Sequence, residues 1–343
     1  KEMYTFDDRN GESLTLRPEA TAGLVRAAIS SGLTHNQKHR IWTAGPMFRY
    51  ERPQKGRYRQ FHQIDVEAFG YAGPDVDIEM IVMSARLWER LGLTRLELEI
   101  NSLGSSEARV AYRERLVEYF EGHRDALDAD SLRRLETNPL RSLDSKNPGM
   151  AEVIAGAPLL IEHLDPESAA HFDALRAGLD AVGIEYRVNP RLVRGLDYYS
   201  RTVFEWVTDA LGSQGAVCSG GRYDGLFEHL GGKPVPAIGW AIGVERLHAL
   251  CEAEQVLPEA VEPHAYLVAV GEGADAAALA LSERLRDAVP GLRLERHLDG
   301  GSMKSQLKGA NRSGARLALI LDERELADGV VAVKPLRDAR AQQ

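Results

Sequence analysis

Residues 47–63 constrain the fold more than any other stretch, because they describe a strand, a cationic loop and a second strand. Five arginine or lysine side chains fall within the eleven residues 49–59. In the second strand Gln63, Asp65 and Glu67 alternate with apolar residues. Successive side chains of a strand point to opposite faces, so one face carries an amide and two carboxylates. The pattern predicts a sheet whose polar face holds a small polar molecule beside a polyanion.

The composition predicts a folded protein of roughly two domains, at about 150 residues each. The chain has 343 residues, 44% of them hydrophobic, and a net charge of -9. That charge argues against nonspecific coating of nucleic acid, although local basic patches can still bind RNA. The two cysteines show no pairing or metal-ligand spacing, which predicts buried, reduced thiols. With no apolar leader, and no apolar run near the ~20 residues of a membrane span, we expect a cytoplasmic protein and no membrane partner.

A linker bracketed by prolines at residues 256–263 divides the chain. Beyond it, strand and helix patterns alternate, which predicts a small α/β domain with a largely parallel sheet at residues 263–343. Before it, residues 1–104 and 184–257 are rich in β-branched and aromatic residues and predict an antiparallel β domain. Residues 105–183 contain apolar residues at helical spacing and predict a helical insertion into that domain.

Four separated segments carry polar or glycine-rich patterns that packing alone does not require. They are residues 15–21, the cationic loop, residues 191–202, and the glycine-containing pair 219–225 and 238–247. Taken singly, each has a simpler explanation, such as a carboxylate that complements a helix dipole or a solvated charged loop. A glycine-rich loop is a weak nucleotide signal by itself, and neither the GxGxxG nor the Walker pattern occurs here.

In combination and in this order, the segments resemble those of the class II aminoacyl-tRNA synthetases, and among them of the histidyl-tRNA synthetase family. Residues 48–61 resemble motif 2 of that class, and residues 239–246 resemble motif 3. Residues 194–199 and 219–225 resemble two segments peculiar to the histidine family. The resemblance implies an α+β fold: an antiparallel-sheet catalytic domain with a helical insertion, plus a C-terminal α/β anticodon-binding domain. Motif 1, which builds the family's dimer interface, is absent, so the expected homodimer rests on the family.

The resemblance implies a two-step reaction of protein biosynthesis. L-histidine and ATP would give histidyl-adenylate, and the histidyl group would then pass to the 3′ end of tRNA(His). ATP is a substrate in this scheme, and Mg²⁺ is expected from the family, with no metal ligands assigned in the sequence. The first step joins two anions with little proton transfer, so positioned positive charge should dominate its catalysis.

The resemblance also implies a role for individual residues. Arg49 and Arg194 would be the catalytic pair at the α-phosphate. The ATP-binding set would be Arg49, Glu51, Arg57, Phe61 and Arg246. The histidine-binding set would be Glu19, Thr21, Gln63, Glu67, Arg194, Tyr198 and Tyr199. Arg52 and Gln54 would lie at the tRNA acceptor end, and the anticodon domain would use Lys304, Lys308 and Arg312.

Histidine selection follows from the chemistry of the ring. A neutral imidazole has one donor and one acceptor, so Glu67 can accept from it and the Tyr199 hydroxyl can complement it. The resemblance implies that Glu19, Thr21 and Gln63 would bind the ammonium group.

Three alternatives remain at this point. The chain could be a catalytically silent, histidine-binding paralogue that regulates ATP phosphoribosyltransferase, although the ATP arginines and the C-terminal domain argue against it. It could be a class II synthetase for another amino acid, against which Glu67 and the paired tyrosines argue. It could be an unrelated RNA-binding module, which a polar strand face makes a poor fit.

Overall fold

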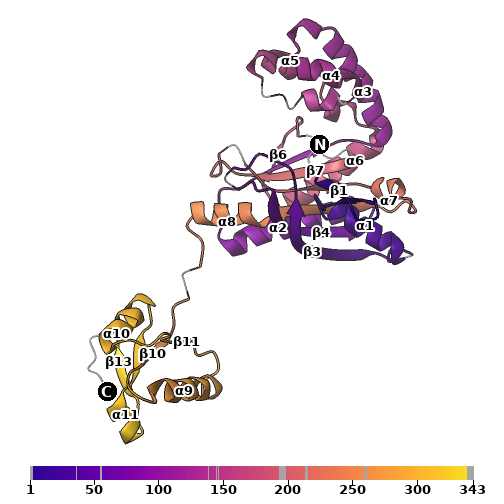
Figure 1. The fold of residues 1–343 in the computed structure, drawn as a ribbon. Helices are drawn as coiled ribbons and strands as arrows, with labels where there is room; N and C mark the ends of the chain where they lie inside the picture. The colour runs from indigo at the N-terminus through magenta and orange to yellow at the C-terminus, as the bar shows by residue number, and fades with distance from the viewer. Residues whose placement is uncertain are drawn as a thin grey trace. The chain divides into compact units, whose positions relative to one another are not determined.

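The structure is a computed structural model that describes residues 3–35, 37–54, 56–137, 139–143, 145, 147–192, 198–212, 215–258 and 261–337. The chain divides into two compact units, Lys1–Leu257 and Pro258–Gln343. Figure 1 shows both, with the first unit in indigo to orange and the second in yellow tones.

A seven-stranded sheet in the order β3-β4-β9-β8-β7-β5-β6 forms the centre of the first unit. All neighbouring strands run antiparallel except β5 and β6, which are parallel. The antiparallel-sheet prediction is confirmed. The strands are β3 (His39–Phe48), β4 (Gln60–Phe69), β5 (Glu97–Ser102), β6 (Arg187–Val188), β7 (Ser200–Val207), β8 (Ala216–Arg222) and β9 (Ala237–Gly243).

The polar face of β4 is the more buried of its two faces. Gln63, Asp65 and Glu67 are buried, whereas the apolar Ile64 and Val66 between them are only half-buried. The strand β9 places Gly243, Ala241 and Gly239 opposite the three polar residues. Small side chains on the neighbouring strand leave room above the polar face, so the sheet is hollowed where its polar residues gather.

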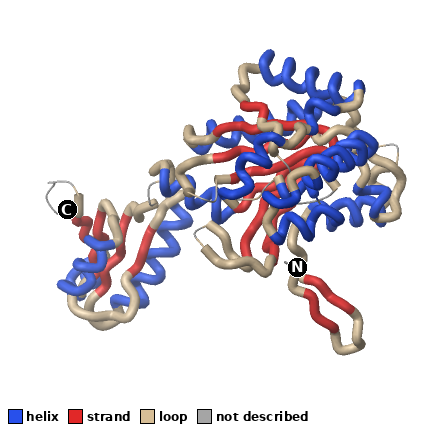
Figure 2. The backbone as a smooth tube through the Cα atoms, turned by 90° about the horizontal axis from the view of Figure 1, so that it is seen from above, coloured by secondary structure: helices blue, strands red, loops and turns tan. Residues whose placement is uncertain are grey.

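Helices cover the sheet, as the view in Figure 2 shows. The helix α2 (Pro74–Leu91) packs against α6 (Pro166–Ala181). Phe172, Leu175 and Leu179 of α6 belong to the same apolar core as Trp88 and the sheet residue Trp206. The other helices that pack within this unit's sheet region are α1 (Thr21–Ser30), α7 (Leu226–His229) and α8 (Val244–Ala253).

A group of helices at one end of the first unit, labelled α3 to α5 in Figure 1, corresponds to most of the predicted insertion. Its described elements are α3 (Ser106–Glu121), η1 (Arg124–Ala126), α4 (Ala129–Thr137), η2 (Pro139–Ser142), η3 (Pro148–Met150), α5 (Ala151–Gly156) and η4 (Leu160–His163). Asp165 caps α6 by accepting from Ser168 N, and it also accepts from Ser105 N at 3.2 Å. One side chain thus joins the two ends of this segment. The last helix of the range 105–183, α6, shares the core of the sheet and is not packed with α3 to α5 alone.

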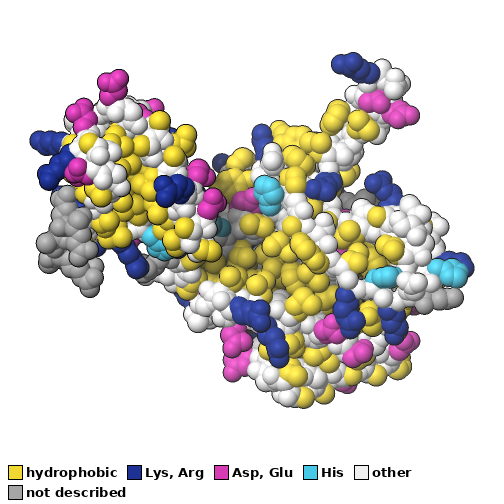
Figure 3. Space-filling model, turned by 90° about the horizontal axis from the view of Figure 1, so that it is seen from below, with side chains coloured by type: hydrophobic (Ala, Val, Ile, Leu, Met, Phe, Trp, Pro, Cys, Tyr) yellow, Lys and Arg dark blue, Asp and Glu magenta, His cyan; other side chains and the backbone are white. Residues whose placement is uncertain are grey.

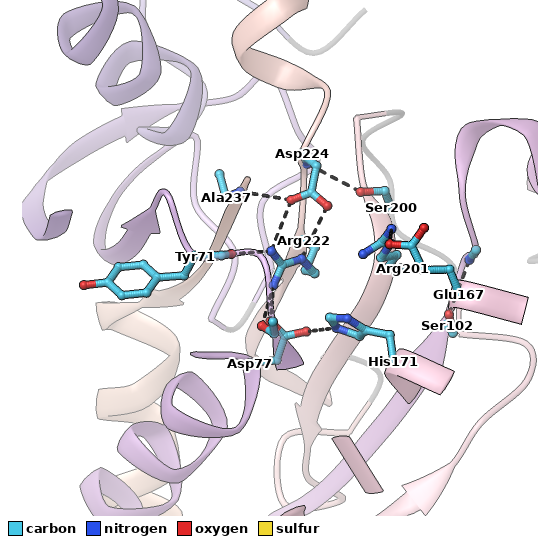
Figure 4. Close-up of polar contacts among 12 residues, drawn as sticks. Tyr71, Asp77, Ser102, Glu167, His171, Ser200, Arg201, Arg222, Asp224 and Ala237 are labelled. Atoms are coloured by element: carbon cyan, nitrogen blue, oxygen red, sulfur yellow. Dashed lines mark hydrogen bonds and ion pairs between the residues drawn. The ribbon is translucent and has the colours of Figure 1, made fainter. Parts of the chain in front are cut away.

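A buried ion pair fixes the end of β8 (Figure 4). Arg222 on β8 contacts Asp77 on α2, and both side chains are 0% exposed. His171 on α6 bonds to the other Asp77 oxygen at 2.7 Å. Arg222 also donates to the carbonyl oxygen of Tyr71 at 2.5 Å and lies 3.4 Å from Asp224. This network ties one strand to two helices and holds the residue that follows Arg222 in place.

Two strands at the start of the described chain, β1 (Thr5–Asp7) and β2 (Ser13–Thr15), pair as an antiparallel hairpin. Every residue in them is exposed, and Figure 2 shows the hairpin projecting from the first unit near the N-terminus. No helix in the described part of the chain is long and apolar enough to span a membrane.

The second unit is a four-stranded sheet in the order β11-β10-β12-β13. The strands β11, β10 and β12 are parallel, and β13 is antiparallel to β12. This confirms the predicted α/β domain with a largely parallel sheet. The strands are β10 (Ala265–Ala269), β11 (Leu294–Arg296), β12 (Leu317–Leu321) and β13 (Ala332–Pro335). The helices are α9 (Ala274–Ala288), α10 (Met303–Arg312) and α11 (Glu323–Asp328).

Candidate active site

A cavity of about 270 Å³ opens over the polar face of β4. Its walls come from β4, β7, β8, β9, the segment before α1, the loop after β3 and the start of α8. These segments are far apart in the sequence, and the sheet topology brings them together. Of the residues predicted for the site, the cavity is lined by Glu19, Thr21, Arg49, Glu51, Arg57, Phe61, Gln63, Tyr198, Tyr199 and Arg246.

One end of the cavity is cationic. Arg49 follows the last residue of β3, and its Nε donates to the carbonyl oxygen of Pro18 at 2.7 Å. Its guanidinium carbon lies 5.0 Å from the centre of the Phe61 ring on β4. A carbonyl and an aromatic face orient a guanidinium without neutralising its charge. Arg49 therefore remains suited to an anionic ligand.

Arg246, in the first turn of α8, is the second cation of this end. Its Nη1 donates to the carbonyl oxygen of Ala216 at 2.5 Å. Burial lowers the pKa of Arg246, and the charges of Arg57 and Arg49 lower it further against the raising effect of Glu51 and Glu205. Arg57 is itself ion-paired with Glu51. Cations crowded in a partly buried cavity raise each other's energy, and a bound polyanion such as a triphosphate would relieve that repulsion.

The other end of the cavity carries carboxylates and phenols. Glu19 accepts a hydrogen bond from the Tyr198 hydroxyl at 2.8 Å and from Ala22 N at 2.9 Å. The second bond places the Glu19 carboxylate at the start of α1, where the helix dipole favours negative charge. Gln63 Oε1 is buried and has no hydrogen-bond partner among the described residues. The cavity thus offers an acceptor that only a ligand or water would satisfy.

Glu67 is 1% exposed, and both of its oxygens are engaged by residues that line the cavity. Thr21 Oγ1 donates to one oxygen at 2.7 Å, and the Tyr223 hydroxyl bonds to the other. Burial raises the pKa of Glu67 to about 8, against the lowering effect of these two hydrogen bonds. Near neutral pH the Glu67 carboxyl group is therefore largely protonated.

One glycine keeps this floor open. A Cβ atom at Gly239 on β9 would collide with the Glu67 carboxylate and the Val66 carbonyl oxygen. Gly239 is thus required because the Glu67 carboxylate lies beside it, and not because its backbone angles are unusual.

Sequence reasoning assigned no role to several residues of the cavity, and two of them lie beside the predicted histidine-binding residues Gln63 and Glu67. Tyr223 lies within the segment 219–225 but had no assigned role, and its hydroxyl bonds to Glu67. Asp65 lies between Gln63 and Glu67 on β4 and lines the cavity with Gln63. The alternation of β4 already placed Asp65 on the polar face, so the signal was present in the sequence.

Other predicted residues lie elsewhere. Arg194 falls in residues 193–197, outside the described residues, and its role stays a prediction. Arg52 and Gln54 are exposed in the loop between β3 and β4, where Gln54 forms an isolated bridge with Arg57. Lys304, Lys308 and Arg312 lie together on one face of α10 in the second unit, bordering a shallow depression with Met303, Leu307 and Asn311.

The fold and the cavity define a class II aminoacyl-tRNA synthetase: an antiparallel sheet whose β3–β4 hairpin and β9–α8 junction each bring an arginine to one cavity. A family model described as histidyl-tRNA synthetase matches residues 1–247, and one described as anticodon binding domain matches residues 264–343. The chain belongs to the histidyl-tRNA synthetase family, which confirms the resemblance seen in the sequence.

Individual relatives agree. The chain is 57% identical over 343 residues to a histidine--tRNA ligase of Hydrogenovibrio crunogenus, covering 100% of this chain and 80% of that protein. It is 59% identical over 343 residues to a histidine--tRNA ligase of Halorhodospira halophila, covering 100% of this chain and 81% of that one. Among solved structures, the apo histidyl-tRNA synthetase of S. aureus matches with a TM-score of 0.82 and 36% identity, over 99% of this chain and 84% of that chain.

Proposed function

We propose that the chain catalyses ATP-dependent activation of L-histidine to histidyl-adenylate, and then transfers the histidyl group to the 3′ end of tRNA(His). The observation that carries this proposal is a single cavity whose lining combines guanidinium groups with carboxylate and phenol groups. The substrates have matching charges, because ATP is a polyanion and the amino acid brings an ammonium group and an imidazole. One cavity that binds both would hold the reacting carboxylate next to the α-phosphate.

In the first step a carboxylate oxygen of histidine forms a bond to the α-phosphorus of ATP. The bond from that phosphorus to the oxygen that bridges to the β-phosphate breaks, and pyrophosphate leaves with the electron pair. Arg49 would stabilise the charge on the α-phosphoryl oxygens, and Arg194 would do so from the opposite side. Phe61 and Arg246 would hold the adenine ring between them, with Glu51 at its edge, and these assignments remain proposals.

The histidine substrate would bind at the carboxylate end. Glu19, Thr21 and Gln63 would bind the ammonium, and the unpartnered Gln63 Oε1 supports that assignment. Glu67 would accept from the imidazole, and its bonds to Thr21 and Tyr223 leave further lone pairs for the ligand. Tyr198 and Tyr199 would close the pocket around the ring.

Magnesium, expected from the family, would neutralise charge on the phosphate oxygens. In the described residues no group of three or more His, Cys, Asp or Glu side chains is arranged to hold a metal. Magnesium often binds through one or two carboxylates and the phosphates of its substrate, keeping several waters. The donor set fits that mode, because Glu205 and Glu245 line the cavity and would supply a carboxylate.

Two surfaces would contact the tRNA. Arg52 and Gln54 in the exposed β3–β4 loop would lie at the acceptor end, beside the cavity where transfer occurs. The face of α10 with Lys304, Lys308 and Arg312 would contact the anticodon region by charge attraction to phosphate.

We further propose a homodimer in the cytoplasm. The view from below shows apolar side chains gathered over the first unit (Figure 3). Trp42, on the edge strand β3, is 73% exposed, and its cross-strand neighbour Val66 is only half-buried. An isolated two-stranded hairpin such as β1–β2 is marginal in water unless it packs on something. Both features suit a second copy of the chain, and the free, buried Cys218 and Cys251 suit a reducing compartment.

Replacing Trp42 tests the dimer. We expect Trp42→Glu to shift the mass measured by light scattering from dimer to monomer, because the charge would be buried in the interface. Exposed Leu317→Glu in the second unit is a control that should leave the mass unchanged. A wild-type chain that is monomeric at all concentrations would refute the dimer.

Exchange of radiolabelled pyrophosphate into ATP tests the proposed activity, with each amino acid supplied in turn. Only L-histidine should support exchange, and the enzyme should then charge tRNA(His). Histidine binding without exchange would favour the silent regulatory paralogue, which the cavity arginines and the close ligase relatives do not favour. Exchange driven by another amino acid would overturn the substrate assignment.

A further inference from the structure

Asp65 is a cavity residue with no part in the roles assigned so far. It lies on β4 between Gln63 and Glu67, lines the cavity and is 1% exposed. Its Oδ2 atom is buried and has no hydrogen-bond partner within the described ranges of the chain. A buried carboxylate without partners is costly, so a sequence that keeps one there calls for a functional explanation.

The strands beside Asp65 offer it no charge partner. Its neighbours in the ladder are Thr43 on β3 and Ala241 on β9. The cations whose charges act on Asp65 are Arg17 and Arg49, and their Nε atoms donate to the carbonyl oxygens of Pro46 and Pro18. The space in front of Asp65 is the cavity itself, so the natural partner is a cationic group brought by a ligand.

The second carboxylate of this region is Glu19, at the start of α1. The charges that act on Asp65 are those of Glu19, which raises its pKa, and of Arg49 and Arg17, which lower it. Burial is the largest influence, and the pKa of Asp65 is raised to about 7. Glu67, the next in-facing residue of β4, is itself largely protonated near neutral pH. Because Asp65 and Glu19 share one cavity, ionising both is costly until a cation binds between them.

We propose that Asp65 binds the α-ammonium group of the amino-acid substrate together with Glu19, and so fixes the amino acid for attack on the α-phosphate. The proposal rests on the proposed function and adds a positioning residue to it. In the free enzyme at neutral pH, Asp65 exchanges a proton with solvent. When the ammonium binds, Asp65 gives its proton to the buffer and stays ionised against the NH₃⁺ group. No other bond is made or broken in this step.

The proposal predicts coupling between one protein group and one ligand group. The pair of ligands for the test is L-histidine and 3-(imidazol-4-yl)propanoate, which lacks only the amino group. The dissociation constant of each ligand with the full chain is measured by calorimetry. For the ligand that binds more weakly, it is measured by competition against the other ligand. Asp65→Asn should lower the affinity for L-histidine by about ten- to a hundredfold, which is the usual loss for a charge-assisted hydrogen bond. The same variant should leave the affinity for the propanoate unchanged or raise it.

Controls separate this role from a structural one. Asp173→Asn makes the same chemical change on the exposed side of α6 and should alter neither affinity. In pyrophosphate exchange, Asp65→Asn should raise KM for histidine and leave KM for ATP unchanged. If Asp65→Asn weakens the binding of L-histidine and of the propanoate equally, or weakens neither, the inference is overturned. If wild type shows no histidine-driven exchange at all, the proposed function fails instead.

A second measurement needs no substitution. Because burial raises the pKa of Asp65 to about 7, part of the Asp65 population is protonated at pH 7, so binding of L-histidine should release more protons than binding of the propanoate. Calorimetry at pH 7 in two buffers of different ionisation enthalpy gives the number of protons that each ligand releases. Equal proton release by the two ligands would overturn the assignment, even if Asp65→Asn failed to fold.

Discussion

Neutralising Asp77 tests how much the buried ion pair with Arg222 stabilises the first unit. In Asp77→Asn the shape of the side chain is kept, but the charge opposite Arg222 is lost. Breaking a buried pair by removing one partner typically costs about 3–5 kcal/mol, because the other charge is left uncompensated. Here Asp224 at 3.4 Å and the carbonyl oxygens of Tyr71 and Gly73 remain as partners of Arg222. We therefore expect the lower end of that range, about 3 kcal/mol, which is more than a hundredfold in the folding equilibrium.

The chain offers a convenient assay and a matched control. All four tryptophans, Trp42, Trp88, Trp206 and Trp240, lie in the first unit, so urea unfolding followed by tryptophan fluorescence reports on that unit alone. Glu79 lies on the same helix as Asp77 and pairs with Arg40 at 2.6 Å, but these side chains are 42% and 49% exposed. Glu79→Gln makes the same chemical change and should leave the free energy of unfolding nearly unchanged, because exposed pairs contribute little. The reasoning would be refuted if Asp77→Asn cost no more than Glu79→Gln.

Two further predictions concern Glu67. Glu67→Ala should raise KM for histidine far more than KM for ATP in pyrophosphate exchange, because Glu67 lies at the carboxylate end of the cavity; equal increases would contradict its assignment to histidine. Glu67→Gln should also change the pH dependence of stability. The folded pKa of about 8 lies above the value of 4.5 expected in the unfolded chain, so the native state holds the extra proton between these values. Its contribution is then present below about pH 4.5 and is lost as pH rises towards about 8. The urea midpoint of wild type should fall over that range relative to Glu67→Gln, and parallel curves for the two proteins would contradict the raised pKa.

The sequence predicted the floor of the site well because the information there is local. Strand alternation depends on adjacent residues only, so the polar face of β4 could be predicted from residues 60–69 alone. The cationic loop and the glycine that ends β9 were equally visible. The resemblance to a known family then supplied roles that residue chemistry by itself left open.

Longer-range features could not be predicted in the same way. Asp77, His171 and Arg222 are each ordinary in their local sequence, and only the fold brings them into one buried cluster (Figure 4). The helix α6 was assigned to the insertion on the spacing of its apolar residues. That spacing shows that one face of the helix is buried, but it does not show which element packs against that face. Its partners proved to be α2 and the sheet. Periodicity reports which face of an element is buried, and the partner of that face depends on topology.

The end of β8 connects the buried ion pair to the cavity. Arg222 and Tyr223 are consecutive residues where β8 ends, and the first is anchored to Asp77 while the second bonds to Glu67. A strand that ends in a buried, multiply bonded arginine has little freedom in the next residue's backbone. The hydroxyl of Tyr223 is thereby held against Glu67, and Glu67 holds Thr21 on the opposite wall of the cavity. The buried ion pair, which contacts no substrate, thus fixes the geometry of the carboxylate end, so its cost in desolvation is offset where the site needs rigidity.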